Sequence, residues 1–429
     1  MARLGTIAGG LGAALVLLAS TNLSAAQTTL TLFGGNTDQA LAAYTDALVA
    51  EFEKQNTDIK VEVELGPGGT ERDNLVKSRL ATGTMSDLFI YNAGSLFQAI
   101  NPAQTTVDLT NEPWQANILD SFKKTVTAPD GSVRGLPMGL AMGGGVLYNK
   151  KIYADLGLQV PKTWDEFMAN NAKIKAAGKV PVIQTFGDTW TSQLFVLSDF
   201  YNVQAQVPNF AADYTANKVH YADTPAAMAG FQHGEDVFKA GYLNEDFAAA
   251  KLADGERMVA AGEGAHYPML TFLLGAIGTD YPDNLKDVGF FALPGNDASK
   301  NGTTVWMPVG LYISAKSQHI AEAKRFAAFA ASKDACSIWA KTTTVTGPFL
   351  IKGCELPAEV PVGVADLAKY FQADGQTAPA LEFVSPIKGP NLENITVEVG
   401  SGIRSAKDAA ALYDEDVKKQ AKQLGLSGW

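Results

Sequence analysis

Trp190 lies in a polar turn that offers a ligand both an aromatic face and a carboxylate. Residues 186–192 read FGDTWTS, and no helical pattern of apolar residues surrounds them. Core packing therefore gives no obvious reason for a tryptophan here, although a packing role remains the alternative. An indole face stacks on flat apolar surfaces and Asp188 accepts hydrogen bonds, so the pair suits non-covalent binding of a small polar ligand.

Motifs of common hydrolytic and nucleotide-dependent enzymes are absent from the sequence. It contains no G-x-S-x-G, no H-E-x-x-H and no G-x-x-x-x-G-K-[ST] pattern. The glycines at 143–145 lead into a strand-like run, which favours backbone geometry over a phosphate cradle. The four histidines are scattered, at His220, His233, His266 and His319, which argues against a histidine-rich metal site. We expect no enzyme activity, no metal and no organic cofactor.

The first 26 residues have the layout of a secretory signal peptide. Arg3 precedes an apolar stretch centred on Leu11–Ala19, and positions 24–26 read Ser-Ala-Ala. The apolar stretch is too short to span a bilayer, and no cysteine follows it to carry a lipid anchor. We expect cleavage after Ala26 and release of a soluble chain, starting at Gln27, into the periplasm.

Size and charge bound the possible classes of protein. Removing 26 of the 429 residues leaves 403, which is too long for one core and natural for two domains. An apolar content of 46% is typical of a globular protein. The excess of 45 acidic over 34 basic residues opposes binding to nucleic acid, whose phosphates attract Lys and Arg. We expect a monomer that does not bind nucleic acid.

The chain has two cysteines, Cys336 and Cys354. Export to an oxidising compartment permits a disulfide between them, and the alternative is two buried free thiols. Cys354 lies in a loop that contains glycine rather than in an apolar run, which favours the disulfide. Closing a loop of this length contributes about 3 kcal/mol to stability in the loop-entropy estimate.

Strands and helices alternate along the N-terminal part of the mature chain. Residues 29–33, 59–65 and 87–91 have the character of strands, while 39–55 and 73–82 have apolar residues at helical spacing. This order predicts βα units and a parallel sheet. Further helices are expected at two later positions, 321–340 and 406–424.

Two apolar segments that contain glycine, 135–150 and 303–314, interrupt this pattern and predict crossings between two domains. The first domain is then expected to comprise 27–141 plus 309–345. The second is expected to comprise 142–308 plus 346–429.

The residues Thr163-Trp164-Asp165-Glu166 form a capping box that begins a helix. Trp164 is therefore expected to pack within the fold rather than to contact a ligand.

Four segments resemble extracellular solute-binding protein family 1, the sugar-binding proteins of ABC importers, which are similar to maltose-binding protein. They are FEKQNTDIKVEVE (52–64), LATGTMSDLFIYNAGSL (80–96), GVLYNKKIYADLGLQVPKTWDEF (145–167) and AEAKRFAAFAAS (321–332). The run at 71–102 resembles the branch that binds raffinose, melibiose and isomaltose. The resemblance implies a type II periplasmic binding protein fold, with two α/β lobes, hinge crossings and a cleft between the lobes. It also implies capture of a short, α-linked oligosaccharide for an inner-membrane ABC permease.

The resemblance extends to individual aromatic residues. An aromatic ring in the place of Trp190 stacks on sugar in that branch, and relatives place another at the strand end of Tyr267. Trp306, on the second crossing, either reaches the cleft or packs the hinge. Asp188 is the best candidate for a carboxylate on the second lobe.

The remaining candidates are polar. Asn36 and Asn92 follow strands of the first lobe, and the asparagine that matches Asn92 is a sugar ligand in the branch. Arg72, at the start of a helix, is a candidate to point across the cleft. Lys352 ends the segment GPFLIK (347–352), which resembles a family segment that lines the cleft.

Two alternative functions stay open at the level of the sequence. A receptor for a sulfonated or phosphorylated sugar would need amides or cations that converge on one spot. An exported glycosidase would need two carboxylates at a defined separation, which a chain with 45 acidic residues can supply.

Overall fold

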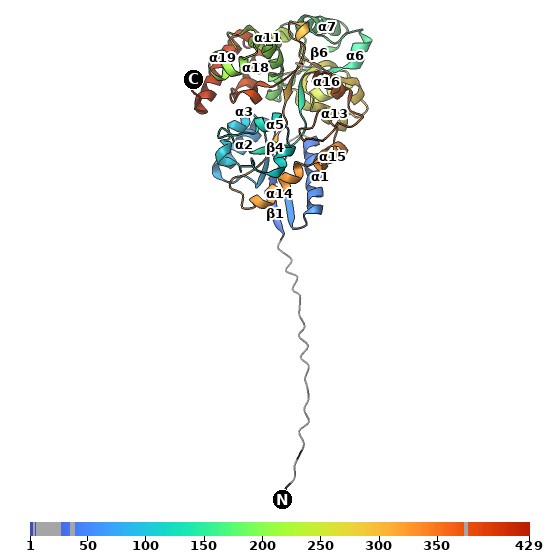
Figure 1. The fold of residues 1–429 in the computed structure, drawn as a ribbon. Coiled ribbons are helices and arrows are strands. Elements are labelled where there is room, and N and C mark those ends of the chain that lie inside the picture. The colour runs from blue at the N-terminus through green and yellow to red at the C-terminus, as the bar shows by residue number, and fades with distance from the viewer. Residues whose placement is uncertain (3–4, 6–26, 35–38, 373–375) are drawn as a thin grey trace.

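The computed structural model describes residues 1–2, 5, 27–34, 39–372 and 376–429. Nearly all of the expected signal peptide, with its cleavage point, and Asn36 lie outside the described residues. Figure 1 shows two α/β lobes, one above the other, with the N-terminal β1 in the lower one. In the described part of the chain, no helix is both long and apolar enough to cross a membrane.

The lower lobe, here called the N-lobe, is built from two separate stretches of the chain. Its elements are β1 (Thr28–Phe33), α1 (Gln39–Gln55), β2 (Ile59–Glu64), α2 (Gly69–Thr82), β3 (Leu88–Tyr91), α3 (Ser95–Gln98), α4 (Pro102–Thr105), η1 (Pro113–Asn117), α5 (Asp120–Thr125), β4 (Gly135–Pro137), β10 (Gly310–Ile313), α14 (Ile320–Ala330) and α15 (Lys333–Thr342). Its sheet has the strand order β2-β1-β3-β10-β4.

The upper lobe, the C-lobe, also takes two stretches. The first gives β5 (Met142–Asn149), α6 (Lys150–Asp155), α7 (Trp164–Ala176), β6 (Val180–Val182), η2 (Thr189–Gln193), α8 (Leu194–Ser198), α9 (Phe200–Gln206), α10 (Phe210–Thr215), α11 (Pro225–Lys239), α12 (Leu252–Ala261), β7 (Gly264–Leu270), α13 (Leu273–Asp280), η3 (Leu285–Asp287), β8 (Val288–Ala292), η4 (Ala298–Lys300) and β9 (Thr303–Trp306). The second gives α16 (Val362–Gln372), β11 (Thr377–Pro379), α17 (Leu381–Val384), α18 (Leu392–Gly400) and α19 (Ala406–Gln423). The sheet order is β11-β9-β5-β7-β6, with β8 also paired to β5.

Helix α1 illustrates why the sequence pattern leads to this packing. Its buried residues include Leu41, Tyr44, Leu48 and Phe52, which recur every three or four positions and so share one face. Tyr44 and Phe52 pack their rings against α15 and α14 respectively. The helix therefore closes one side of the N-lobe core.

The N-lobe extends further along the chain than the expected boundary at residue 345. Leu350 and Ile351 belong to the N-lobe core, and Cys354 packs against it. Ile351 also forms a β-bridge with Ile118. Cys336 and Cys354 form the disulfide that was expected, and it ties this segment to α15. The third crossing into the C-lobe therefore follows residue 354, because a bridge and a disulfide hold the preceding segment.

One expected helix is two helices in the structure. The amphipathic pattern over 321–340 continues without interruption, but α14 ends at Ala330 and α15 begins at Lys333. Ser332 separates them because its hydroxyl accepts a hydrogen bond from the backbone N–H of Ala335, which caps a new helix.

The glycines at 143–145 lie inside β5, rather than in the crossing where the sequence placed them. A Cβ at Gly144 would lie 2.2 Å from the ring of Trp306, and one at Gly145 would lie 2.4 Å from the carbonyl oxygen of Phe291. These glycines therefore allow close packing of the sheet rather than unusual backbone angles.

The expected helix start at Thr163 is present in α7. The Thr163 hydroxyl accepts from the N–H of Glu166, whose carboxylate accepts from Lys162 N, one residue before the helix cap. Trp164 is buried, donates to Asp236 and stacks on His233 with a centroid separation of 3.7 Å. Its role is packing within the C-lobe.

Candidate functional site

The topology brings one edge of each sheet to the junction between the lobes. In the N-lobe, β1 and β3 are parallel to each other and antiparallel to β10, so their carboxyl ends share an edge with the start of β10. In the C-lobe, the start of β5 pairs with the ends of β7 and β9. Short crossings, 138–141 from β4 to β5 and 307–309 from β9 to β10, join the two edges. Loops that follow these strands are therefore the natural place for a ligand site.

The two lobes touch at this junction. Thr70 Oγ1, in α2, donates to Glu393 Oε1, in α18, at 2.8 Å. Phe383 packs against the cores of both lobes. Gly94 has φ +70°, and a Cβ there would lie 2.4 Å from the carbonyl oxygen of Glu382. In Figure 1, α18 accordingly lies above α2 and α3.

Trp190 lies in η2, on the C-lobe side of the junction. Its ring is half-buried and faces Phe272, with centroids 6.2 Å apart and planes inclined by 37°. Ser192, two residues later, donates to the backbone oxygen of Glu393, the residue that contacts the N-lobe. Phe272 is the second residue after the carboxyl end of β7. The two rings thus form an aromatic pair at the C-lobe edge, and stacking on a ligand stays a prediction.

Asp188 has a structural role in addition to its place beside Trp190. Its Oδ2 accepts from the backbone N–H of Leu252 at 2.7 Å, at the start of α12. This bond fixes the turn against α12. One oxygen of the carboxylate is therefore already used within the C-lobe.

Two of the aromatic candidates belong to the C-lobe core. The Tyr267 side chain is fully buried, and its hydroxyl forms a 2.6 Å hydrogen bond with Thr185 Oγ1. Its ring lies against Gly255 of α12, so it presents no face to the junction, and the stacking role expected for it is wrong. Trp306 is 6% exposed and donates to Glu382 Oε1 at 2.5 Å. Of the two roles expected for Trp306, these contacts favour packing at the hinge over a contact in the cleft.

Asn92 follows β3 at the N-lobe edge. It is half-buried, and its backbone oxygen accepts from the hydroxyl of Tyr312 at 2.9 Å. Within the part of the chain that the structure describes, its carboxamide has no hydrogen-bond partner. Asn92 is therefore placed and available as both donor and acceptor, and its ligand role stays a prediction.

Arg72 does not point across to the other lobe as expected. Its Nη2 donates to the carbonyl oxygens of Gly34 at 2.5 Å and Ile90 at 2.6 Å, and its guanidinium lies over the Phe33 ring at 4.4 Å. These contacts hold the ends of β1 and β3 together. Burial lowers the pKa of Arg72 to about 10, which leaves it charged at neutral pH. Its role is to position the N-lobe edge that carries Asn92.

Lys352 also departs from expectation. It is exposed, and its Nζ donates to the carbonyl oxygen of Ala116, in η1 of the N-lobe, at 2.9 Å. The bridge from Ile351 to Ile118 keeps this segment on the N-lobe surface. Lys352 is therefore bound to its own lobe, and nothing in its contacts connects it to the junction.

Sequence reasoning did not identify several residues that lie at the junction. Glu382 accepts from Trp306 and lies 3.5 Å from Lys388, and both charged side chains are largely buried. Phe272 could have been identified from the sequence, because it lies two residues after a strand. Glu382 and Phe383 could not have been identified from the sequence, because the short helix α17 has no distinctive pattern of residues.

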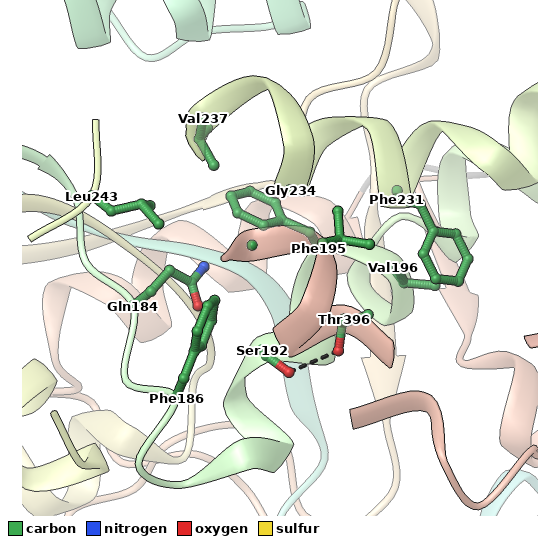
Figure 2. A pocket seen from close by; sticks show the side chains of 13 residues that line it. Gln184, Phe186, Ser192, Phe195, Val196, Phe231, Gly234, Val237, Leu243 and Thr396 are labelled. Atoms are coloured by element: carbon green, nitrogen blue, oxygen red, sulfur yellow. Dashed lines mark hydrogen bonds between the residues drawn. The ribbon is translucent and has the colours of Figure 1, made fainter. Parts of the chain in front are cut away.

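Figure 2 shows a small cavity inside the C-lobe, whose lining includes Phe186 and Ser192 from the segment 186–192. Phe186, Phe195 and Phe231 are among its apolar lining residues, and Ser192, which also lines it, forms a hydrogen bond with Thr396. Only about 10 Å³ can hold the centre of a water molecule, which is room for about one water. The cavity is too small to hold a sugar ring and belongs to the packing of the lobe.

Among the described residues, no group of three or more His, Cys, Asp or Glu side chains is placed to hold a metal ion. The site at the junction is therefore described by aromatic rings, amides, hydroxyls and carboxylates.

Comparisons with known proteins agree with this architecture. Residues 34–335 match the family described as bacterial extracellular solute-binding protein. A multiple sugar-binding protein of Streptococcus mutans is 26% identical over 332 residues, covering 74% of this chain and 76% of that protein. A solved chitin oligosaccharide binding protein has a TM-score of 0.79 at 20% identity, covering 92% of this chain and 99% of that chain. The solute-binding protein RafE in complex with raffinose has a TM-score of 0.75 at 21% identity, with 93% and 100% covered.

The solved structures share the two-lobe, type II fold with this chain, which confirms the fold class expected from the sequence. The family match covers most of both stretches of the N-lobe and the whole first stretch of the C-lobe. The protein thus belongs to the bacterial extracellular solute-binding proteins.

Proposed function

We propose that this protein is the substrate-binding component of an ABC importer. It captures a short α-linked oligosaccharide between its two lobes and delivers the sugar, chemically unchanged, to the inner-membrane permease. It works as a monomer in the periplasm, after removal of residues 1–26.

The observation that carries the proposal is that the C-lobe edge of the junction has an aromatic pair and the N-lobe edge has an amide without a hydrogen-bond partner among the described residues. Trp190 and Phe272 offer ring faces from the C-lobe edge. Asn92 offers a donor and an acceptor from the N-lobe edge. Flat C–H faces and hydroxyl groups on one ligand match this combination, and a sugar has both.

The relatives support a sugar as the ligand. One is a multiple sugar-binding protein, and another, from Bacillus subtilis, is a melibiose/raffinose/stachyose-binding protein that is 25% identical over 158 residues. The charges at the junction favour a neutral sugar over a phosphorylated or sulfonated one. Lys388 is paired with Glu382, and Arg72 is directed into its own lobe, where its Nη2 donates to two backbone carbonyls and its Nη1 is buried.

A thermal-shift screen tests the proposal. The panel comprises melibiose, raffinose, isomaltose and maltose, with phosphorylated and sulfonated sugars included. A micromolar ligand corresponds to about −8 kcal/mol of binding free energy, so a hundredfold excess raises the unfolding free energy by about 3 kcal/mol. We expect a neutral oligosaccharide to stabilise the protein and to be recovered intact by chromatography. Cleavage of the sugar, or a response to anionic sugars alone, would contradict the proposal.

Thr70→Val tests whether closure of the lobes contributes to affinity. The Thr70–Glu393 hydrogen bond links the lobes, so it stabilises only the closed arrangement. Its loss is expected to cost about 1 kcal/mol, or roughly fivefold in dissociation constant by calorimetric titration. Thr82→Val is the matched control, because the hydrogen bonds of Thr82 to described residues stay within its own helix and the turn that follows. Equal affinities for both variants would show that this contact plays no part in closure.

A further inference from the structure

The C-lobe has a second, larger pocket at a distance from the lobe junction. It has a volume of about 360 Å³, and β5, β8, α16 and the segment 298–301 contribute to its lining. Tyr148 of β5 lines it, while Met142, at the other end of the same strand, lies at the junction. Six residues of strand span about 20 Å. The pocket is therefore separate from the proposed oligosaccharide site.

The pocket lies beside the outer edge of β8. This strand pairs with β5 on one side. On its other side, two backbone N–H groups of β8 donate hydrogen bonds to side chains of α16. Phe290 N donates to Asp366 Oδ2 at 3.3 Å, and Ala292 N donates to the Tyr370 hydroxyl at 3.0 Å. Since these donors are already used, the edge does not favour addition of a peptide strand. The pocket is better suited to a small molecule.

Tyr370 provides a fixed aromatic surface in this pocket. Its hydroxyl is held by Ala292 N, and its ring meets the Phe290 ring edge to face, with centroids 6.2 Å apart and planes at 86°. The ring is half-buried, so part of it is available to a ligand. An aromatic surface that is already immobilised binds a flat partner at a low cost in conformational entropy.

The polar lining combines donors and acceptors with little net charge. Asn301 lines the pocket, and its Nδ2 atom is buried without a hydrogen-bond partner among the described residues, so rotation of the carboxamide would turn this donor toward an incoming oxygen. Lys369 is neutralised by Asp366 at 2.7 Å. Lys162 is then the single lining cation without an ion-pair partner in the described chain. One such lysine does not favour a phosphate or sulfate, which typically recruits several cations or N–H donors.

We propose that this pocket is a second binding site, for a neutral carbohydrate of monosaccharide size. Its volume lies near the lower end of the range for ligand pockets. Tyr370 receives the C–H face of the sugar ring, and Asn301 Nδ2 donates to a ring hydroxyl. The site is independent of the lobe junction, because the lining residues all come from the C-lobe.

Ligand-observed NMR on the full-length chain tests this site. The probes are glucose, galactose, mannose, xylose and N-acetylglucosamine, with inorganic phosphate as the anionic arm. Trp190→Ala serves as the background, because it is expected to weaken binding at the junction. We expect at least one sugar to bind this background, and Asn301→Leu or Ser299→Trp added to it to weaken that binding at least about tenfold.

The variants are chosen to leave the fold intact. The Asn301 amide nitrogen has no partner to lose, and Ser299 is exposed at the pocket. Ser427→Trp, at another exposed serine of the C-lobe, is the matched control and should bind as the background does. Unchanged melting temperatures check folding. The proposal is overturned if none of the five sugars binds, if binding is indifferent to both pocket substitutions, or if phosphate binds there in preference to every sugar.

Discussion

Trp190→Ala is expected to weaken oligosaccharide binding by roughly 2–4 kcal/mol, the range of a binding hot spot. This corresponds to about a thirtyfold to a thousandfold rise in dissociation constant. The physical reason is that the variant removes the half-buried ring that faces Phe272 at the lobe junction. Calorimetric titration measures the change. In the wild type, binding should also quench or shift tryptophan fluorescence, because a sugar would cover this ring.

Trp164→Ala is the control for that experiment. Trp164 is buried and stacks on His233, so its removal should lower the unfolding free energy by about 3–5 kcal/mol. Affinity in the molecules that remain folded should stay close to that of the wild type. Trp190→Ala should lose less stability, because its ring is only half-buried. Wild-type affinity of Trp190→Ala, or its unfolding, would remove this turn from the site.

Replacing both cysteines, Cys336→Ser with Cys354→Ser, is expected to lower the unfolding free energy by about 3 kcal/mol. The disulfide closes a loop with a sequence separation of 18 residues, and opening it enlarges the conformational entropy of the unfolded chain. Denaturant unfolding measures this loss. The bridge lies within the N-lobe, so binding of the sugar should change much less than stability.

Two controls accompany the cysteine experiment. Ser337→Ala, an exposed position on the same helix α15, should leave stability nearly unchanged. Thiol labelling of the unfolded but unreduced wild type should detect no free cysteine. Two labelled thiols, or a double variant as stable as the wild type, would show that the bridge contributes nothing.

Local pattern sufficed for much of the fold. Helix α1 has the bounds, 39–55, that its apolar spacing predicts, and the alternation of strands and helices predicts an α/β fold with parallel strands. The two-lobe arrangement was implied by the resemblance to the solute-binding family. The pattern of apolar residues was insufficient where a single hydrogen bond determines where a helix begins. The apolar period runs through Ser332, and only the hydrogen bond that caps α15 reveals the break between the two helices.

The site was predicted less completely than the fold, for physical reasons. A residue at the end of a strand reaches the junction only if its side chain turns that way, and Tyr267 turns toward α12 instead. Arg72 is charged and near the edge, but its Nη2 donates to backbone carbonyls within its own lobe. Trp190 was predicted from its polar surroundings and lies on the C-lobe side of the junction, while its role as a ligand contact stays a prediction. Phe383 was not, because it comes to the junction from a distant part of the chain.

Small-angle X-ray scattering tests most directly whether the two lobes close on an oligosaccharide. The contacts between the lobes include the Thr70–Glu393 bond and the packing of Phe383, and short crossings join the lobes. Such an arrangement allows a hinge whose closed state the ligand selects. With a saturating oligosaccharide from the thermal-shift screen, the radius of gyration should fall from a larger, open value to that of the structure described here. An unchanged radius at saturation would contradict capture between the lobes.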